Sequence, residues 1–183
     1  MKTFFIIFGT FIFLVLGTAF YYGMFNKVNF IEKSIGGEVL VYQEMIGDYK
    51  QSGSKIDIVS QELKNNFNLD CQIGFGVYFD QPGQVAKEKL RSEVGCLLSK
   101  ESISRFDEIS LSKDLKIRRN PVARNIVSEF PYRNQISYFL GPLKIYSALN
   151  KYLKIHNYQA APSMELYDSQ KDRIEYRMVV VEK

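Results

Sequence analysis

The residues most suggestive of chemistry in this sequence are a glutamate and a tyrosine near the C-terminus. Glu165 and Tyr167 lie within Pro162–Val181, where apolar and polar residues alternate on either side of a polar turn, Ser169–Arg173. This pattern predicts a hairpin of two strands, and strand residues two positions apart point to the same face of a sheet. A carboxylate and a phenol on one face could bind a ligand or exchange a proton.

The sequence lacks the residues that other kinds of site need. Its single histidine is His156, and its two cysteines, Cys71 and Cys96, form no Cys-x-x-Cys motif. Neither a zinc cluster nor a histidine-dependent triad can be assembled from this set, so we expect no metal site and no cofactor. Catalysis, if present, would have to use carboxylates or tyrosines, and no activated nucleophile is visible.

The two cysteines allow two interpretations. If Cys71 and Cys96 lie on neighbouring strands they would be close together, and an oxidising, extracytoplasmic location could join them in a disulfide. Two buried thiols are the expectation that we favour from the sequence alone.

The charge pattern does not suggest a nucleic-acid partner. The formal net charge is +4, and the lysines and arginines are interleaved with acidic residues. Four arginines are locally clustered, and we interpret them as a solvated face rather than an anion site; they are Arg118, Arg119, Arg124 and Arg133.

The N-terminal residues 1–25 predict a transmembrane anchor and hence a lipid bilayer as partner. No charged residue occurs from Thr3 to Phe25, and a helix of this length can cross the ~30 Å hydrocarbon core of a bilayer. A cleaved signal peptide is the alternative, with Gly17–Ala19 as small residues at a cleavage site. We favour the anchor because the apolar run continues beyond Ala19.

The side of the membrane on which the remaining chain lies cannot be assigned. Lys2 flanks one end of the apolar run while Lys27 and Lys33 flank the other, so the positive-inside rule nearly cancels. We expect a single-pass membrane protein with a linker over 26–37 and one domain over 38–183.

The domain divides into two similar runs of elements. Hydrophobic periodicity predicts strand, helix, strand, strand in each half, separated by a polar segment over 100–114. Pro142 should kink the second helix or mark its start. Helical spacing places one apolar stripe on each helix: Ile56, Val59, Leu63 and Phe67 on the first, and Ile136, Phe139, Leu140, Leu143, Tyr146, Leu149 and Leu153 on the second. The expected elements are strands over 38–46, 72–80, 90–99, 115–119, 123–130 and the final hairpin, and helices over 54–67 and 134–156.

This repetition predicts a duplicated α+β fold. Tyr49-Lys-Gln precedes the first helix as Tyr132-Arg-Asn precedes the second, although the offset between the halves drifts. Two β-α-β-β units would form an antiparallel sheet with both helices on one side. A cleft between the halves is the expected consequence.

Several segments resemble the GyrI-like small-molecule-binding family over about 39–181. They are the doubled strand-helix-hairpin pattern, Phe130-Pro-Tyr132, Ala148-Leu149 with Tyr152-Leu153, Met164-Glu-Leu-Tyr167 and Tyr176-Arg-Met-Val-Val. Others are similar to a membrane-anchored branch of this family; these are Val77–Pro82, Arg91–Ser99, Ala148–Leu153 and Ala161–Tyr167. That branch works through a disordered tail, so we do not carry its receptor activity over to a sequence that ends at Lys183. The absence of a helix-turn-helix region likewise argues against the regulator role of other members.

The resemblance implies an aromatic-lined pocket between the halves, with a buried glutamate that recognises cationic or polar ligands. Glu165 occupies the position of that glutamate. An unpaired carboxylate in an apolar cleft has a raised pKa, and an organic cation would restore its pairing while stacking on rings. Alternatively, Glu165 is salt-bridged or hydrogen-bonded to a neighbouring side chain and holds the hairpin.

The aromatic residues that the resemblance suggests as ligand contacts are Tyr42, Phe75, Phe130, Tyr132 and Tyr167. Core packing is the favoured role for these rings, because aromatic strand residues usually fill cores. The leading functional expectation is a membrane-anchored domain that binds an amphipathic or cationic small molecule. A scaffold that binds a protein partner at the membrane is the alternative, and a hydrolase of small electrophiles is a weaker one, so we do not expect an enzyme.

Overall fold

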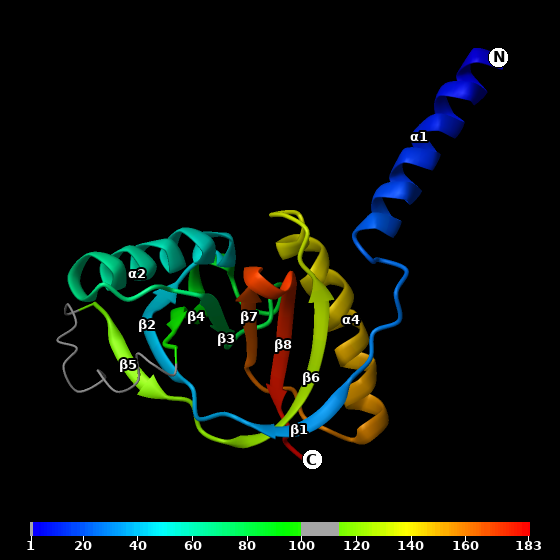
Figure 1. Cartoon of the computed structure of the whole chain (residues 1–183). Coiled ribbons are helices and arrows are strands. Elements are labelled where there is room, and N and C mark those ends of the chain that lie inside the picture. The colour runs from blue at the N-terminus through cyan, green and yellow to red at the C-terminus, as the bar shows by residue number, and fades with distance from the viewer. Residues whose placement is uncertain (1, 100–113) are drawn as a thin grey trace.

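The computed structural model describes residues 2–99 and 114–183 of the chain, so nearly all of the expected polar segment 100–114 lies outside the described residues. An isolated helix is followed by a mixed helix and sheet domain (Figure 1). The helices are α1 (Lys2–Tyr21), α2 (Ser52–Phe67) and α4 (Ser137–His156). The strands are β1 (Ile31–Ile35), β2 (Val39–Ile46), β3 (Ile73–Tyr78), β4 (Arg91–Leu97), β5 (Lys116–Arg119), β6 (Ala123–Pro131), β7 (Ser163–Asp168) and β8 (Arg173–Val179).

The strands form one sheet in the order β1-β6-β8-β7-β3-β4-β2-β5, and every neighbouring pair is antiparallel. The α+β class with an antiparallel sheet is therefore confirmed. The centre of the sheet is the β3–β7 pair, where Gly74 lies opposite Tyr167 and Gly76 lies opposite Glu165. These four residues occupy one face of the two strands, since facing partners share a face.

Helix α2 packs on the sheet through Val59 and Leu63, which contact Val39 and Val41 of β2 and Cys96 of β4. These two helix residues are four positions apart and therefore lie on the same side of the helix. Their side chains are fully buried, as the sequence pattern predicts.

Helix α4 packs on β6 and β8 through its C-terminal half. Leu149 and Leu153 contact Ile126 and Met178. The helix begins at Ser137 and runs through Pro142, so the proline is not its start. The buried positions continue N-terminally as Ile145, Gly141 and Ser137, and the apolar residues Ile136, Phe139 and Leu143 of the expected stripe are exposed instead.

The segment expected as a linker, 26–37, contains strand β1, and the expectation of a linker is wrong for this part. Residues Ile31–Ile35 pair with β6 and complete one edge of the sheet. The carboxylate of Glu32 accepts hydrogen bonds from Tyr152, Tyr158 and Arg124. A short, mixed-charge strand of this kind carries no strong sequence signal, and the partner edge decides its conformation.

The two cysteines form a disulfide, so the expectation of two buried thiols is wrong. Cys71 lies two residues before β3, and Cys96 lies in β4, where it pairs with Gly74. The antiparallel β3–β4 register brings their Cα atoms to 5.4 Å, within the usual range for a bridge.

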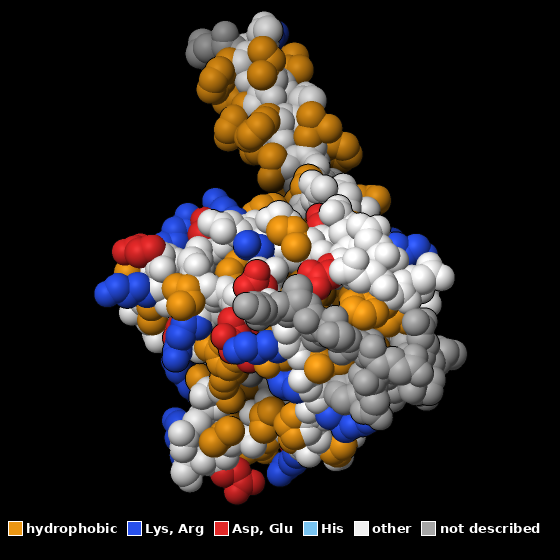
Figure 2. Space-filling view, turned by 90° about the vertical axis from the view of Figure 1, so that its left-hand side faces the viewer, with side chains coloured by type: hydrophobic (Ala, Val, Ile, Leu, Met, Phe, Trp, Pro, Cys, Tyr) orange, Lys and Arg blue, Asp and Glu red, His pale blue; other side chains and the backbone are white. Residues whose placement is uncertain are grey.

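Helix α1 stands away from the domain, with no buried residue along its length. Exposed hydrophobic side chains run along the helix, whereas the face of the domain seen in Figure 2 mixes basic, acidic and apolar side chains. Among the described residues it is the one helix long and apolar enough to cross a membrane. A signal sequence near an N-terminus has the same length and composition.

The chain that leaves α1 is built into the domain. The Tyr22 side chain is buried, and Asn134 Nδ2 donates a hydrogen bond to its hydroxyl at 2.7 Å. Lys144 Nζ donates to the carbonyl of Gly23. The apolar residues Met24, Val28 and Phe30 then pack against a buried cluster beneath α4. This cluster consists of Phe130, Ile145, Ile174 and Tyr176. The end of α1 and the N-terminal half of α4 are thus joined directly.

Candidate functional site

A cleft of about 1180 Å³ lies between α2 and α4, above the centre of the sheet. Side chains of β3 and β7 form its floor, including Tyr78, Glu165 and Tyr167. One wall comes from the start of α2, and the other from the first half of α4 and the segment before it. Both helices therefore pack on the same face of the sheet, and the cleft lies between them.

Two glycines of β3 make room on the cleft floor. A Cβ on Gly76 would lie 2.6 Å from the hydroxyl of Tyr78, and a Cβ on Gly74 would lie 3.0 Å from Ile56 of α2. Carbon atoms do not approach this closely without displacement. The Gly74-x-Gly76 pair therefore allows the Tyr78 ring to fold over its own strand and allows α2 to approach the sheet.

Glu165 is bonded to tyrosines from two elements. Tyr146 of α4 donates to Oε1 at 2.7 Å, and Tyr167 of β7 donates to Oε2 at 3.3 Å. The Tyr167 hydroxyl lies 2.7 Å from that of Tyr78. Since Tyr167 uses its hydrogen on Glu165, Tyr78 must donate to Tyr167, giving a chain from Tyr78 through Tyr167 to the carboxylate.

The carboxyl group of Glu165 titrates near neutral pH. Burial raises its pKa to about 7, and the hydrogen bonds from Tyr146 and Tyr167 oppose this rise. Burial and the nearby carboxylate together raise the pKa values of both tyrosines well above their usual value. Both phenols therefore stay protonated and act as donors.

No cationic side chain of residues 2–99 and 114–183 forms an ion pair with Glu165. Its side chain is only 4% exposed. A buried carboxylate without a counter-charge is costly, so the site favours either the neutral acid or a positively charged ligand. The salt-bridge alternative from the sequence is thus not found in the described residues, whereas the hydrogen-bonded alternative is.

An aromatic wall runs from the mouth of the cleft to Glu165. The ring centroids of Tyr132 and Tyr138 are 5.2 Å apart, and those of Tyr138 and Tyr167 are also 5.2 Å apart. The Tyr78 ring adds a second surface, 4.6 Å from that of Tyr49. Faces and edges of these rings can contact an organic cation.

The structure brings Glu165, Tyr167 and Tyr132 together, but not the other three residues suggested by the sequence. Tyr42 and Phe75 lie on the opposite face of the sheet with Leu40 and Leu166. The cause is strand alternation, because Phe75 is flanked by the cleft-facing Gly74 and Gly76. Phe130 is buried beneath α4 against Ile145 and Ile174. For these three rings the core-packing alternative agrees with the structure.

Sequence reasoning missed Tyr78, Tyr138 and Tyr146 as part of the site. Tyr78 follows Gly74 and Gly76 at strand spacing, a signal that could have placed it on the same open face. The helical spacing places Tyr146 on the apolar face of the second helix, and its side chain does pack toward the sheet. Only the packing of α4 over β7 shows that its hydroxyl reaches Glu165.

Curated relatives match part of this chain and are much longer than it. It is 30% identical over 141 residues to testis-expressed protein 264 homolog of Mus musculus, covering 72% of this chain and 42% of that protein. It is 31% identical over 119 residues to testis-expressed protein 264 of Homo sapiens, covering 60% of this chain and 37% of that protein. The chain spans about two fifths of the length of these relatives. No family model matches it.

Solved structures share the architecture. EcmrR in its DNA complex has a TM-score of 0.64 at 12% identity, over 92% of this chain and 64% of that chain. The EcmrR C-terminal domain gives a TM-score of 0.57 at 12% identity, over 85% and 99%. The likeness is one of fold. It is consistent with the GyrI-like architecture that the sequence motifs indicate.

Proposed function

We propose that this protein is a membrane-anchored, GyrI-like domain that binds an amphipathic cation in the cleft between α2 and α4. The observation that carries the proposal is Glu165: a buried carboxyl group, bonded to two tyrosines, at the floor of a large ring-lined cleft. A ligand that supplies a positive charge would ionise it and replace the missing counter-ion.

The chemistry of the cleft favours a cation with an apolar body. Two acceptor sites of the carboxylate are taken by Tyr146 and Tyr167, and a carboxylate offers about four, so an ammonium or similar group can still bind. The rings of Tyr132 and Tyr138 provide surface for apolar or cation–π contact. The volume suits a drug-sized or lipid-sized molecule.

The order of the elements supports a duplicated domain. In each half a strand, a helix and a hairpin follow in sequence, as β2-α2-β3-β4 and as β6-α4-β7-β8. The sheet order runs β6-β8-β7 and then β3-β4-β2, so each half places its hairpin between its first strand and the other half. On this proposal the domain comprises residues 38–183, with β1 added at its edge.

The disulfide favours one location of the domain relative to the membrane. A Cys71–Cys96 bridge persists in oxidising environments and is rare where glutathione keeps thiols reduced. We therefore place the domain on the extracytoplasmic or luminal side, with α1 as its anchor.

A thermal-shift series on the full chain in lipid nanodiscs tests the ligand proposal, with tetraphenylphosphonium as the cation and tetraphenylborate as its anionic match. The cation at 100 times its Kd should stabilise the wild type by about 2.7 kcal/mol. Glu165→Gln should lose this stabilisation. Glu44→Gln should retain it, because Glu44 is an exposed carboxylate that pairs with Lys116. Equal stabilisation of the wild type and Glu165→Gln, or none by any hydrophobic cation, contradicts the proposal.

A further inference from the structure

An exposed apolar stripe lies at the start of α4. It consists of Ile136, which directly precedes the helix, and of Phe139 and Leu143 in its first two turns. Their exposed fractions are 49%, 59% and 69%. The spacing of three and four residues places them on one face of the helix. Further along, the same face continues with the polar residues Ser147, Asn150 and Lys154. The apolar exposure of this face is therefore confined to its N-terminal end.

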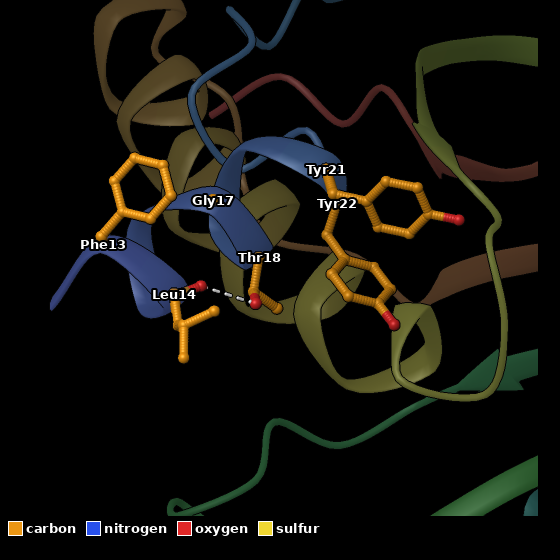
Figure 3. A pocket seen from close by; sticks show the side chains of 6 residues that line it. All are labelled: Phe13, Leu14, Gly17, Thr18, Tyr21 and Tyr22. Atoms are coloured by element: carbon orange, nitrogen blue, oxygen red, sulfur yellow. Dashed lines mark hydrogen bonds between the residues drawn. The ribbon is translucent and has the colours of Figure 1, made fainter. Parts of the chain in front are cut away.

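That end of α4 is fixed to the end of α1. Asn134, two residues before the stripe, donates to the Tyr22 hydroxyl, and Lys144, one residue after it, donates to the Gly23 carbonyl. The Arg133 guanidinium lies 5.7 Å from the centre of the Tyr21 ring. Figure 3 shows the rings of Tyr21 and Tyr22 projecting from the last turn of α1 on the side of α4. The stripe is held beside the point where α1 meets the domain.

The residues around this junction are of the kinds that occupy a membrane–water interface. Tyrosines concentrate at that level of the bilayer, and lysine and arginine extend their charged ends toward its polar surface. Tyr21 and Arg133, whose side chains are both exposed, mark such a level at the end of α1. With α1 in a bilayer, the stripe lies next to the headgroups rather than in bulk water.

The stripe also forms one edge of the cleft. Phe139 and Leu143 line the cleft as well as being exposed, whereas the opposite edge carries Lys50, from the turn before α2, and Ser54 and Asp57 of α2. The cleft thus has an apolar edge beside the anchor and a polar edge on the other side. A molecule that leaves the bilayer along Phe139 and Leu143 would move toward Glu165.

We propose that the start of α4 lies in the membrane interface and that the cleft receives its ligand from the bilayer, as a long-chain amine whose ammonium group pairs with Glu165. The bilayer is the occupant of the exposed stripe, and the alkyl chain of the ligand lies along Phe139 and Leu143. This inference rests on the proposed function, namely that α1 is a membrane anchor and that the ligand is a cation. It adds the surface of α4 that contacts the bilayer and the path by which the ligand enters the cleft.

The depth of the stripe can be measured with a single fluorophore, because the sequence contains no tryptophan. Ile136→Trp and Ile155→Trp are matched variants, both at exposed isoleucines of α4 but at opposite ends. The full chain is placed in phosphatidylcholine vesicles with brominated acyl chains. Ile136→Trp fluorescence should be quenched about twofold, and Ile155→Trp fluorescence should be unchanged, since an interfacial helix buries its apolar face only ≈ 5–10 Å into the bilayer.

Vesicle flotation tests separately whether α1 anchors the chain in the membrane and whether the start of α4 contacts the bilayer. A chain that does not float with vesicles overturns the anchor and the inference together. A chain that floats while both tryptophans remain unquenched overturns the interface alone and leaves the anchor standing.

The route is tested by comparing hexadecylamine held in vesicles with octylamine in solution, followed by tyrosine fluorescence in stopped flow. Ile136 is not part of the cleft lining, so Ile136→Asp should slow loading of hexadecylamine about tenfold by weakening contact with the bilayer, and leave octylamine binding unchanged. Ile155→Asp should change neither. Equal loading rates in the wild type and Ile136→Asp, or equal slowing of both amines, would overturn the proposed route from the bilayer. If neither amine binds, the proposed function itself is overturned.

Discussion

Tyr146 on α4 donates a 2.7 Å hydrogen bond to Glu165 on β7, at the floor of the cleft between α2 and α4. The bond couples the position of a helix to the ionisation of a buried acid. It also links Tyr146, which helical spacing assigns to the packing face of its helix, to Glu165, the residue that the family resemblance suggests as the ligand-binding carboxylate.

Tyr146→Phe should raise the pKa of Glu165 above about 7, because a hydrogen bond that favours the charged form is removed. Carbon-13 chemical shifts of the glutamate side chain, followed as a function of pH, report this value. Tyr49→Phe, which removes a phenol without contact to Glu165, is the control. A Glu165 pKa that falls or stays fixed in Tyr146→Phe would show that the bond does not act on the carboxylate.

Stability of the ligand-free protein should decrease as the pH rises from about 4.5 to 7. The folded state keeps a proton on Glu165 that the unfolded chain releases, so ionisation costs folding roughly 3 kcal/mol by pH 8. Glu165→Gln does not titrate, and its stability relative to the wild type should increase over the same window. Urea denaturation at pH 5, 6, 7 and 8 measures the difference, and a difference independent of pH would argue that the carboxyl pKa is not raised.

Binding of a cation should release a proton at pH 6 to 7, since the ligand favours ionised Glu165. Affinity should therefore increase as the pH rises through about 7 and level off above it. Calorimetry in two buffers of different ionisation enthalpy gives the number of protons released. Affinity for a hydrophobic cation that is the same at pH 5.5 and 8 would contradict pairing with Glu165.

Gly76→Ala should destabilise the protein by about 1–3 kcal/mol, because its Cβ would lie 2.6 Å from the Tyr78 hydroxyl and displace that ring. Gly53→Ala is a matched control in α2, where a Cβ meets no atom within 4 Å. It should instead stabilise the helix by about 0.5–1 kcal/mol. Chemical denaturation of both variants measures the contrast, and similar effects from the two would mean that β3 does not need glycine at this position.

Removing the bridge with Cys71→Ser and Cys96→Ser together should lower the free energy of unfolding by about 3 kcal/mol, as expected for closure of a 25-residue separation. Unfolding of the oxidised wild type and of the double variant gives this value. Labelling with a maleimide polymer before and after reduction, on protein from intact cells, checks the pairing in its compartment. Thiols that react fully without reductant would contradict both the bridge and the luminal placement.

Local patterns in the sequence were sufficient for most individual elements. β-Branched and aromatic residues predicted β2, period-two alternation predicted the β7–β8 hairpin, and Val59 and Leu63 predicted the buried face of α2. The same reasoning failed at β1, whose conformation depends on the free edge of β6. It also misjudged Ile136, Phe139 and Leu143, because helical periodicity finds an apolar stripe but not what covers it.

The sequence by itself determined that Glu165 and Tyr167 share one strand face, since side chains alternate along a strand whatever its neighbours are. Only the tertiary structure decided what that face meets. The β3–β7 pairing sets Gly76 opposite Glu165, and the packing of α4 brings Tyr146 to the carboxylate from a helix nineteen positions earlier in the chain. These contacts join residues far apart in sequence, and their energy depends on burial that no local pattern specifies.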